Sequence, residues 1–219
     1  MIKLRTPTPD AATLADLLQR LGDVPPERIR LYRPLGSATE QDVIDIEARE
    51  NRLCELVDGV LVEKTVGYYE ARLALLIGHF LEDFLEQHDL GIVLGADGTL
   101  RLMPGLVRIP DVSFISWDRL PNRELPAEPI PDLVPDLAVE VLSEGNTVAE
   151  MRRKLAEYFR VGVRMVWFID PTLRSAEVYT ALNRLRRINE EQILRGGRVL
   201  PGFSLRLGDL FARAGKRRS

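Results

Sequence analysis

Residues 163–170, VRMVWFID, form a nearly continuous apolar run, and this run limits the folds open to the chain. A strand with one face in water alternates apolar and polar residues, so an unbroken apolar strand predicts burial on both faces. Other elements must then cover both faces of its sheet. Helical spacing of apolar residues over 68–87 predicts a long amphipathic helix, and a second helix is expected over 147–161. The order of these elements predicts a mixed α/β layer fold.

Further segments have the composition of strands, and turn residues separate them. One is a hairpin, CELVDGVLVEK over 54–64, whose Asp58-Gly59 pair suits a tight turn. A second hairpin around Gly196-Gly197 and a short helix near Leu210 are expected at the end of the chain. The remaining predicted strands are 91–95 (GIVLG), 99–103 (TLRLM), 107–116 (VRIPDVSFIS), 136–143 (DLAVEVLS) and 175–180 (SAEVYT), the last as an antiparallel neighbour of 163–170.

The first fifty residues have a different character from the rest. Asp10 is placed to cap a helix over 11–21, and Thr39 to cap another over 40–49. We therefore expect residues 1–50 to form an N-terminal helical extension, residues 51–212 the main domain, and residues 213–219 a basic tail.

Size and composition favour a single globular core. The chain has 219 residues, of which 45% are hydrophobic. Its only cysteine, Cys54, cannot form an internal disulfide, and no signal-peptide pattern or membrane-length apolar run is present. A cytoplasmic protein without a membrane segment is the simplest expectation.

Charge is divided unevenly along the chain. Residues 1–151 contain 14 Lys and Arg against 27 Asp and Glu, whereas residues 152–219 contain 16 against 6, so the two parts have net charges of about −13 and +10. A basic surface beside an acidic pocket could bind phosphate. The same arginines are equally consistent with an ordinary solvated surface.

Two acidic residues interrupt apolar strand segments: Asp111 in RIPDVSFIS and Glu140 in PDLAVEVLS. A buried carboxylate is costly unless a cation or hydrogen bonds compensate it, so both are expected at one shared site. Strand alternation places Asp111 on a face with Ser113 and Ile115. Magnesium, or manganese in its place, suits such a pair because Mg²⁺ prefers oxygen ligands and needs only one or two protein carboxylates.

The helix after Glu140 offers a cation for the same site. Its start is marked by a capping-box pattern, Thr147 with Glu150, and Gly162 is expected to end it. Lys154 and Arg152 flank its apolar stripe about equally, so helical geometry does not choose between them. Alternatively, Lys154 pairs with Glu150 four residues earlier as an ordinary surface contact.

The sequence gives little support for a zinc site, a histidine-centred triad or a nucleotide-binding loop. The only histidines, His79 and His88, have no cysteine or second histidine at ligand spacing, which argues against a structural zinc site or a histidine-centred triad. Gly95 and Gly98 lie in a turn between strands, and a nucleotide-binding loop would instead open a helix.

From Cys54 to about Leu210 the chain resembles the Uma-type family of restriction-endonuclease-like proteins, formerly a domain of unknown function, within the PD-(D/E)XK nuclease superfamily. The matching segments occur in the family's order: CELVDGVLVEK, IPDVSFIS, PDLAVEVLS, KLAEYFRVGVRMVWFIDP and VLPGFSLRLGDLF. The resemblance implies a restriction-endonuclease-like core, with a central mixed β-sheet flanked by helices, and a metal-dependent hydrolase.

The resemblance also implies roles for individual residues. Asp111 matches the aspartate of the PD half-motif and Glu140 the second acid. The superfamily's lysine would stand two residues after Glu140, where this chain has Leu142. In Uma-type proteins the lysine is found on the following helix, and Lys154 matches that place. Glu70 occupies the position of an additional catalytic acid from the first core helix.

Glu55 recurs in the family's hairpin motif, where it could reach the pocket or serve a structural role at a strand edge.

Two functions remain open from the sequence. The first is a magnesium-dependent endonuclease acting on DNA, with Asp111 and Glu140 as metal ligands and Lys154 at the scissile phosphate. A homodimer would be the simplest way to cut both strands. The second is a non-catalytic nucleic-acid- or protein-binding regulatory module on a nuclease scaffold.

Overall fold

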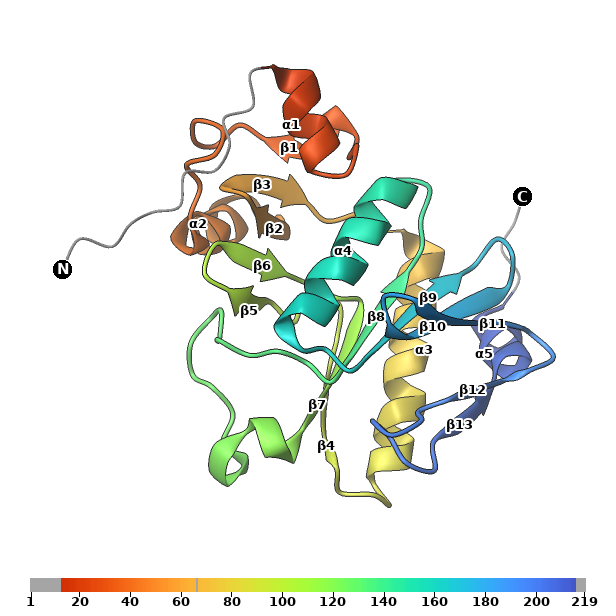
Figure 1. The fold of residues 1–219 in the computed structure, drawn as a ribbon. Helices are drawn as coiled ribbons and strands as arrows, with labels where there is room; N and C mark the ends of the chain where they lie inside the picture. The colour runs from red at the N-terminus through yellow and green to blue at the C-terminus, as the bar shows by residue number, and fades with distance from the viewer. Residues whose placement is uncertain (1–12, 66, 216–219) are drawn as a thin grey trace.

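The computed structural model describes residues 13–65 and 67–215, and its strands form two main sheets (Figure 1). The five-stranded sheet is antiparallel throughout, whereas the six-stranded sheet is mixed because β8 and β9 pair in parallel. In spatial order, the first sheet contains β1 (Ile29–Arg30), β3 (Val60–Glu63), β2 (Cys54–Val57), β6 (Leu106–Arg108) and β5 (Leu100–Met103). The second contains β11 (Arg184–Asn189), β10 (Ser175–Ala181), β9 (Met165–Asp170), β8 (Leu137–Val141), β7 (Val112–Ser116) and β4 (Gly91–Leu94).

Helices and short connections complete the described part of the chain. A small hairpin pairs β12 (Ile193–Arg195) with β13 (Ser204–Arg206), close to the predicted Gly196-Gly197 position. None of the helices in the described residues is long and apolar enough to cross a membrane. The α-helices are α1 (Leu14–Arg20), α2 (Glu40–Glu50), α3 (Tyr68–Leu85), α4 (Val148–Val161) and α5 (Leu207–Ala214), and the 3₁₀ turns are η1 (Pro26–Arg28), η2 (Trp117–Arg119) and η3 (Pro121–Arg123).

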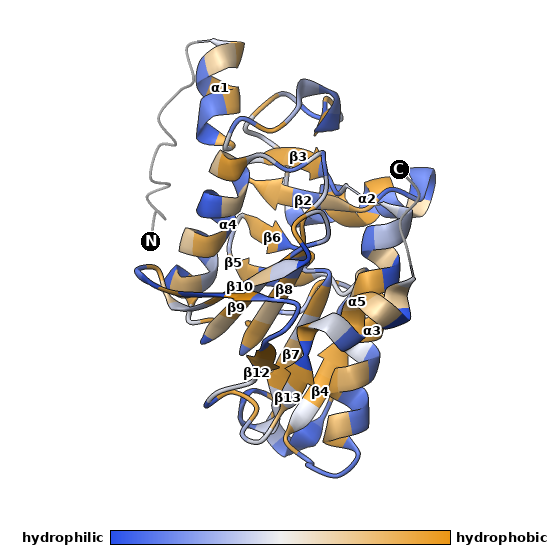
Figure 2. Cartoon of the chain, turned by 90° about the vertical axis from the view of Figure 1, so that its right-hand side faces the viewer, coloured by the Kyte–Doolittle hydropathy of each residue, from blue (hydrophilic) through white to orange (hydrophobic). Residues whose placement is uncertain are grey.

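Helices cover both faces of the six-stranded sheet, as the apolar run at 163–170 predicts. In Figure 1, α3 lies behind the sheet and α4 crosses in front of it. Alternation along β8 sends Val139 into the core with α3 and Ala138 into the core with α4. Trp167 of β9 is fully buried on the α3 side. Figure 2 shows β8 and β9, in the middle of this sheet, mostly in the hydrophobic colour, whereas α1 and α3 carry both colours. The predicted mixed α/β fold is confirmed.

Local sequence signals set several element boundaries. The Asp58-Gly59 turn joins β2 to β3 with positive φ angles of 50° and 70°, as a two-residue hairpin requires. Thr39 caps α2 in a capping box completed by Asp42. The α1 helix begins at Leu14 behind a Thr13 cap, while the predicted cap Asp10 lies outside the described residues.

The prediction of one strand over 107–116 is wrong. The segment forms two strands in different sheets: β6 pairs with β2, and β7 pairs with β8. Pro110 lies between them, and because proline has no backbone N–H it cannot donate to a sheet ladder. The chain therefore passes from one sheet to the other through Ile109, Pro110 and Asp111, so Asp111 lies just before a strand.

The N-terminal segment packs into the same core as the later helices. Leu17 and Leu21 of the α1 region are buried together with Met151 and Leu155 of α4. Strand β1 also extends the five-stranded sheet by pairing with β3. A domain boundary after residue 50 stays a prediction, and the packing joins the two parts closely.

Candidate active site

Asp111 and Glu140 lie opposite each other where β7 and β8 run antiparallel. The register pairs Val112 with Val139, which places the residue before β7 beside Glu140. The Asp111 backbone N–H donates to the Val139 carbonyl at 3.0 Å, and Asp111 Oδ2 accepts from the Val141 N–H at 2.7 Å. These two backbone contacts fix the Asp111 carboxylate at the end of the strand pair.

Glu140 is 5% exposed and shares the α4 side of the sheet with Ala138 and Leu142, as strand alternation predicts. On the neighbouring strand, Ile115 belongs to the same core. The two acids in apolar strand segments therefore do belong to one site.

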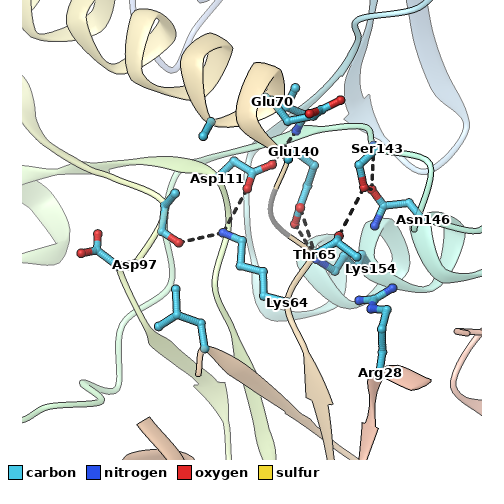
Figure 3. A pocket seen from close by; sticks show the side chains of 15 residues that line it. Arg28, Lys64, Thr65, Glu70, Asp97, Asp111, Glu140, Ser143, Asn146 and Lys154 are labelled. Carbon is cyan, nitrogen blue, oxygen red and sulfur yellow. Dashed lines mark hydrogen bonds and ion pairs between the residues drawn. The ribbon is translucent and has the colours of Figure 1, made fainter. Parts of the chain in front are cut away.

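A pocket of about 170 Å³ opens in front of the two acids. Its lining includes Asp111, Glu140 and Lys154, and Figure 3 shows Lys64 and Lys154 directed toward the carboxylates. Glu70, in the first turn of α3, also lines the pocket. The structure thus brings together all four residues that the sequence singles out, from a strand junction, a strand and two helices.

Lys154 is buried against two carboxylates. Its Nζ lies 3.1 and 3.2 Å from the two Glu140 carboxylate oxygens and 3.1 Å from Glu55 Oε1. Lys154 is 3% exposed, whereas Arg152 is exposed and lines a neighbouring groove. The geometry places Lys154 beside Glu140, in agreement with the family resemblance.

The alternative of a surface pair between Lys154 and Glu150 is wrong. Both side chains are buried, and Glu150 instead receives two hydrogen bonds of 2.8 Å from the guanidinium of Arg28. Burial would raise the pKa of Glu150, but the hydrogen bond from Arg28 and the charge of Lys154 outweigh it and lower that pKa. Arg28 links the N-terminal segment to α4 at one wall of the pocket.

Tyr158 lies one helical turn after Lys154 and contacts the same acid. Its hydroxyl donates to Glu140 Oε1 at 2.5 Å. Burial and the adjacent Glu140 carboxylate both raise the pKa of Tyr158, so the phenol stays protonated and acts as a donor. The K-x-x-x-Y pattern thus supplies two donors to Glu140.

A buried cluster behind Lys154 joins the two sheets. Arg108 of β6 donates to Glu55 Oε2 at 2.6 Å and to Glu157 Oε2 at 2.9 Å. Glu55 Oε1 also accepts from the Ile109 N–H at 3.1 Å. Sequence reasoning left the role of Glu55 open and missed Arg108 and Glu157. The available signal was an arginine inside the apolar segment LVRIP.

The charges of this cluster shift one another's pKa values. Burial, with the nearby Asp111 and Glu55 carboxylates, raises the pKa of Glu140 against the opposing effect of Lys154. Burial would also raise the pKa of Glu55, but Lys154 and Arg108 outweigh it and bring that pKa to about 2. Burial would lower the pKa of Lys154, but Glu140 and Glu55 raise it, so Lys154 is a charged ammonium.

Lys64 is a second lysine in the pocket, and no sequence pattern indicated it. Its Nζ lies 3.0 Å from Asp111 Oδ1 and donates to the Ala96 carbonyl at 2.8 Å. Lysine after a strand usually points to solvent, so only the folded chain reveals this contact.

The donor set suits a hard divalent ion. Within residues 13–65 and 67–215, no group of three or more His, Cys, Asp or Glu side chains is arranged to hold a metal. A magnesium site does not require one, because Mg²⁺ commonly takes one or two carboxylates and completes its octahedron with waters and substrate oxygens. Asp111 and Glu140 place two carboxylates at the wall of one pocket, where they could hold such an ion.

Comparisons with known proteins agree with this architecture. The crystal structure of a putative nuclease belonging to DUF820 from Anabaena variabilis ATCC 29413 is similar to this chain, with a TM-score of 0.66 at 16% identity, over 75% of this chain and 92% of that one. No curated protein sequence matches the chain. The model of the Uma2 family, described as "Putative restriction endonuclease", matches residues 41–208. The chain therefore belongs to the Uma2 family.

Proposed function

We propose that the protein is a magnesium-dependent endonuclease that hydrolyses phosphodiester bonds in DNA, with manganese able to replace magnesium. The observation that carries the proposal is the convergence of Asp111, Glu140 and Lys154 on one pocket. Membership of the Uma2 family supports it. Since cutting both strands of a duplex is simplest with two sites, we include a homodimer in the proposal.

Asp111 and Glu140 would hold the ion through their carboxylate oxygens. When bound, Mg²⁺ would polarise the scissile phosphate and lower the pKa of a coordinated water. Asp111 is suited to this role because two backbone contacts fix it, and Glu140 because Tyr158 and Lys154 orient it.

Lys154 would stabilise negative charge at the phosphate. Attack of a water oxygen on phosphorus and departure of the sugar oxygen build up charge on the non-bridging oxygens. The Lys154 ammonium is held in place before the reaction by Glu140 and Glu55, so it needs little rearrangement to meet that charge. Glu70, at the pocket wall, is proposed as an auxiliary acid.

A cleavage assay tests the proposal. Purified protein is incubated with plasmid and single-stranded DNA in Mg²⁺, Mn²⁺ or EDTA. We expect EDTA to stop cleavage and Asp111→Asn, Glu140→Gln and Lys154→Met each to slow it about 100-fold or more. Arg152→Met is the matched control, because it removes the other cation that helical spacing allowed; its rate should stay within about threefold of the parent. Cleavage that persists at the parent rate in EDTA and in all three variants would exclude the proposal.

One observation favours the second candidate, a nucleic-acid- or protein-binding regulatory module. Each carboxylate oxygen of the acidic pair already contacts a donor: Lys64 and the Val141 N–H at Asp111, and Tyr158 and Lys154 at Glu140. Salt-sensitive DNA binding that is indifferent to Mg²⁺, without cleavage, would support this candidate over the enzyme.

A further inference from the structure

The Lys64 ammonium occupies a position in the pocket that would also suit a metal ion. It follows β3 directly, and its ammonium lies between a carboxylate oxygen, Asp111 Oδ1 at 3.0 Å, and a carbonyl oxygen of Ala96 at 2.8 Å. Carboxylate and carbonyl oxygens are also the ligands that hard divalent cations prefer. The ammonium therefore uses ligands of the type that the proposed Mg²⁺ would use.

The contact is enclosed. The side chain of Lys64 is 6% exposed and that of Asp111 is 16% exposed. Lysines usually keep the ammonium in water and bury only the stem, so an ammonium turned into a pocket wall is unusual. Solvent screens such a pair less than a surface ion pair, so the Lys64 ammonium compensates the Asp111 carboxylate at short range.

The other lysine of the pocket is placed differently. Lys154 contacts Glu140 and Glu55, whereas Lys64 contacts Asp111. Asp111 Oδ2 is directed to the Val141 N–H, so Oδ1 is the oxygen that Lys64 and an incoming ion would share.

We infer that Lys64 is an internal cation that competes with the divalent ion for Asp111 and thereby sets the metal affinity of the site; the inference rests on the proposed function. Without metal, the Lys64 ammonium compensates the Asp111 carboxylate. If a divalent ion were held by Asp111 Oδ1, the Lys64 ammonium would have to leave that oxygen, because two positive charges would otherwise be in close contact there. Lys64 thus lowers the affinity of the empty protein for metal.

Isothermal titration calorimetry with MnCl₂, on the full chain without DNA, tests the inference. The Lys64→Met variant removes the charge and keeps the chain length, and we expect its Kd for Mn²⁺ to fall about tenfold or more. Lys64→Arg keeps a cation and should stay within about threefold of the parent. Arg52→Met removes a nearby charge whose ion pairs with Glu50 and Glu63 lie outside the pocket lining, and it should leave Kd unchanged.

The Asp111→Asn substitution, added to Lys64→Met, should abolish Mn²⁺ uptake if the ion binds at this site. Thermal unfolding in EDTA checks that each variant is folded; if Lys64→Met is not, Lys64→Gln replaces it. A Kd for Lys64→Met equal to or weaker than the parent value, with uptake still lost in the Asp111→Asn variant, would overturn the inference and leave the metal site standing. Absence of Mn²⁺ uptake by every variant would overturn both the inference and the proposed metal site.

Discussion

Glu55 is in contact with two buried cations at once, Lys154 and Arg108. Each cation has a second carboxylate partner, Glu140 and Glu157 respectively. Removing one partner of a buried ion pair leaves an uncompensated charge, which costs more than the intact pair contributes. The Glu55 carboxylate is therefore expected to matter for stability as well as for the position of Lys154.

We expect Glu55→Gln to lower the free energy of unfolding by about 3 kcal/mol, because both cations lose a negative partner in a buried site. Urea denaturation at pH 7 measures the change. Glu190→Gln is the matched control: it breaks the half-exposed pair of Glu190 with Arg174 and should cost about 0–1 kcal/mol. Equal losses in the two variants would contradict the buried role.

The Glu55→Gln variant also tests how the free energy of unfolding depends on pH. Burial alone would raise the pKa of Glu55, but Lys154 and Arg108 bring it to about 2, below the ordinary value of 4.5. A carboxyl with a depressed folded pKa contributes stability above its unfolded pKa and loses that contribution as pH falls through the folded pKa. The stability difference between the parent and Glu55→Gln should therefore be constant above about pH 5 and shrink toward pH 2. Unfolding titrations at several pH values measure it; a difference that widens on acidification would refute the assignment.

The hairpin of β2 and β3 positions two of the pocket's charged groups. Glu55 lies on β2, and Lys64 directly follows β3. Gly59 in the turn has φ +70°, and a Cβ there would lie 2.3 Å from the carbonyl oxygen of Gly36. The turn therefore depends on glycine for both its conformation and its close contact.

We expect Gly59→Ala to lower the free energy of unfolding by about 1–3 kcal/mol, through the strained φ and the clash. Gly78→Ala is the control, because Gly78 lies within α3 with no atom near the added Cβ, and it should stabilise by about 0.5–1 kcal/mol. Thermal unfolding measures both. A neutral Gly59→Ala would show that the turn tolerates a side chain.

The helix boundaries that the sequence predicts correctly are those set by local capping residues. Thr147 caps α4 by accepting from the Glu150 N–H, and Gly162 ends that helix with φ 97°. A helix cap involves residues no more than four positions apart, so it can be predicted from the sequence alone. The break in 107–116 was missed because the two flanking strands join different sheets, a choice made by partners distant in sequence.

The same reasoning applies to the site. Asp111 and Glu140 are visible as acids within apolar segments, whereas the choice of Lys154 over Arg152 came from the family resemblance. Arg108 meets its carboxylate partners about 50 residues away, with separations of 53 and 49. No periodic pattern in the sequence predicts contacts between residues so far apart. The buried cluster of Glu55, Arg108 and Glu157 is therefore visible only in the folded structure.

Residues 13–50 contribute to two hydrophobic clusters that they share with the later domain, which bears on how the protein unfolds. Leu17 is 3% exposed and packs with residues of α4, whereas Leu14 in the same helix is 57% exposed. Arg28 adds a buried ion pair to Glu150 of α4. We therefore expect residues 13–50 to unfold together with the rest.

Leu17→Ala should lower the free energy of unfolding by about 2–4 kcal/mol, because it leaves a cavity against α4, while Leu14→Ala should change it by less than about 0.5 kcal/mol. Calorimetry should show a single transition in both variants, shifted downward only in Leu17→Ala. Two separate transitions, with only the smaller one shifted, would instead support an independent N-terminal extension.

The connection through Ile109, Pro110 and Asp111 has a mechanical consequence. Asp111 and Glu140 are fixed to each other within one sheet, whereas Glu55 reaches Lys154 from the other. Tilting one sheet against the other would stretch the contacts that cross between them, Glu55–Lys154 and Lys64–Asp111, and leave the two acids aligned. Such a movement would therefore shift both pocket lysines relative to the carboxylates while the spacing of the carboxylates is kept.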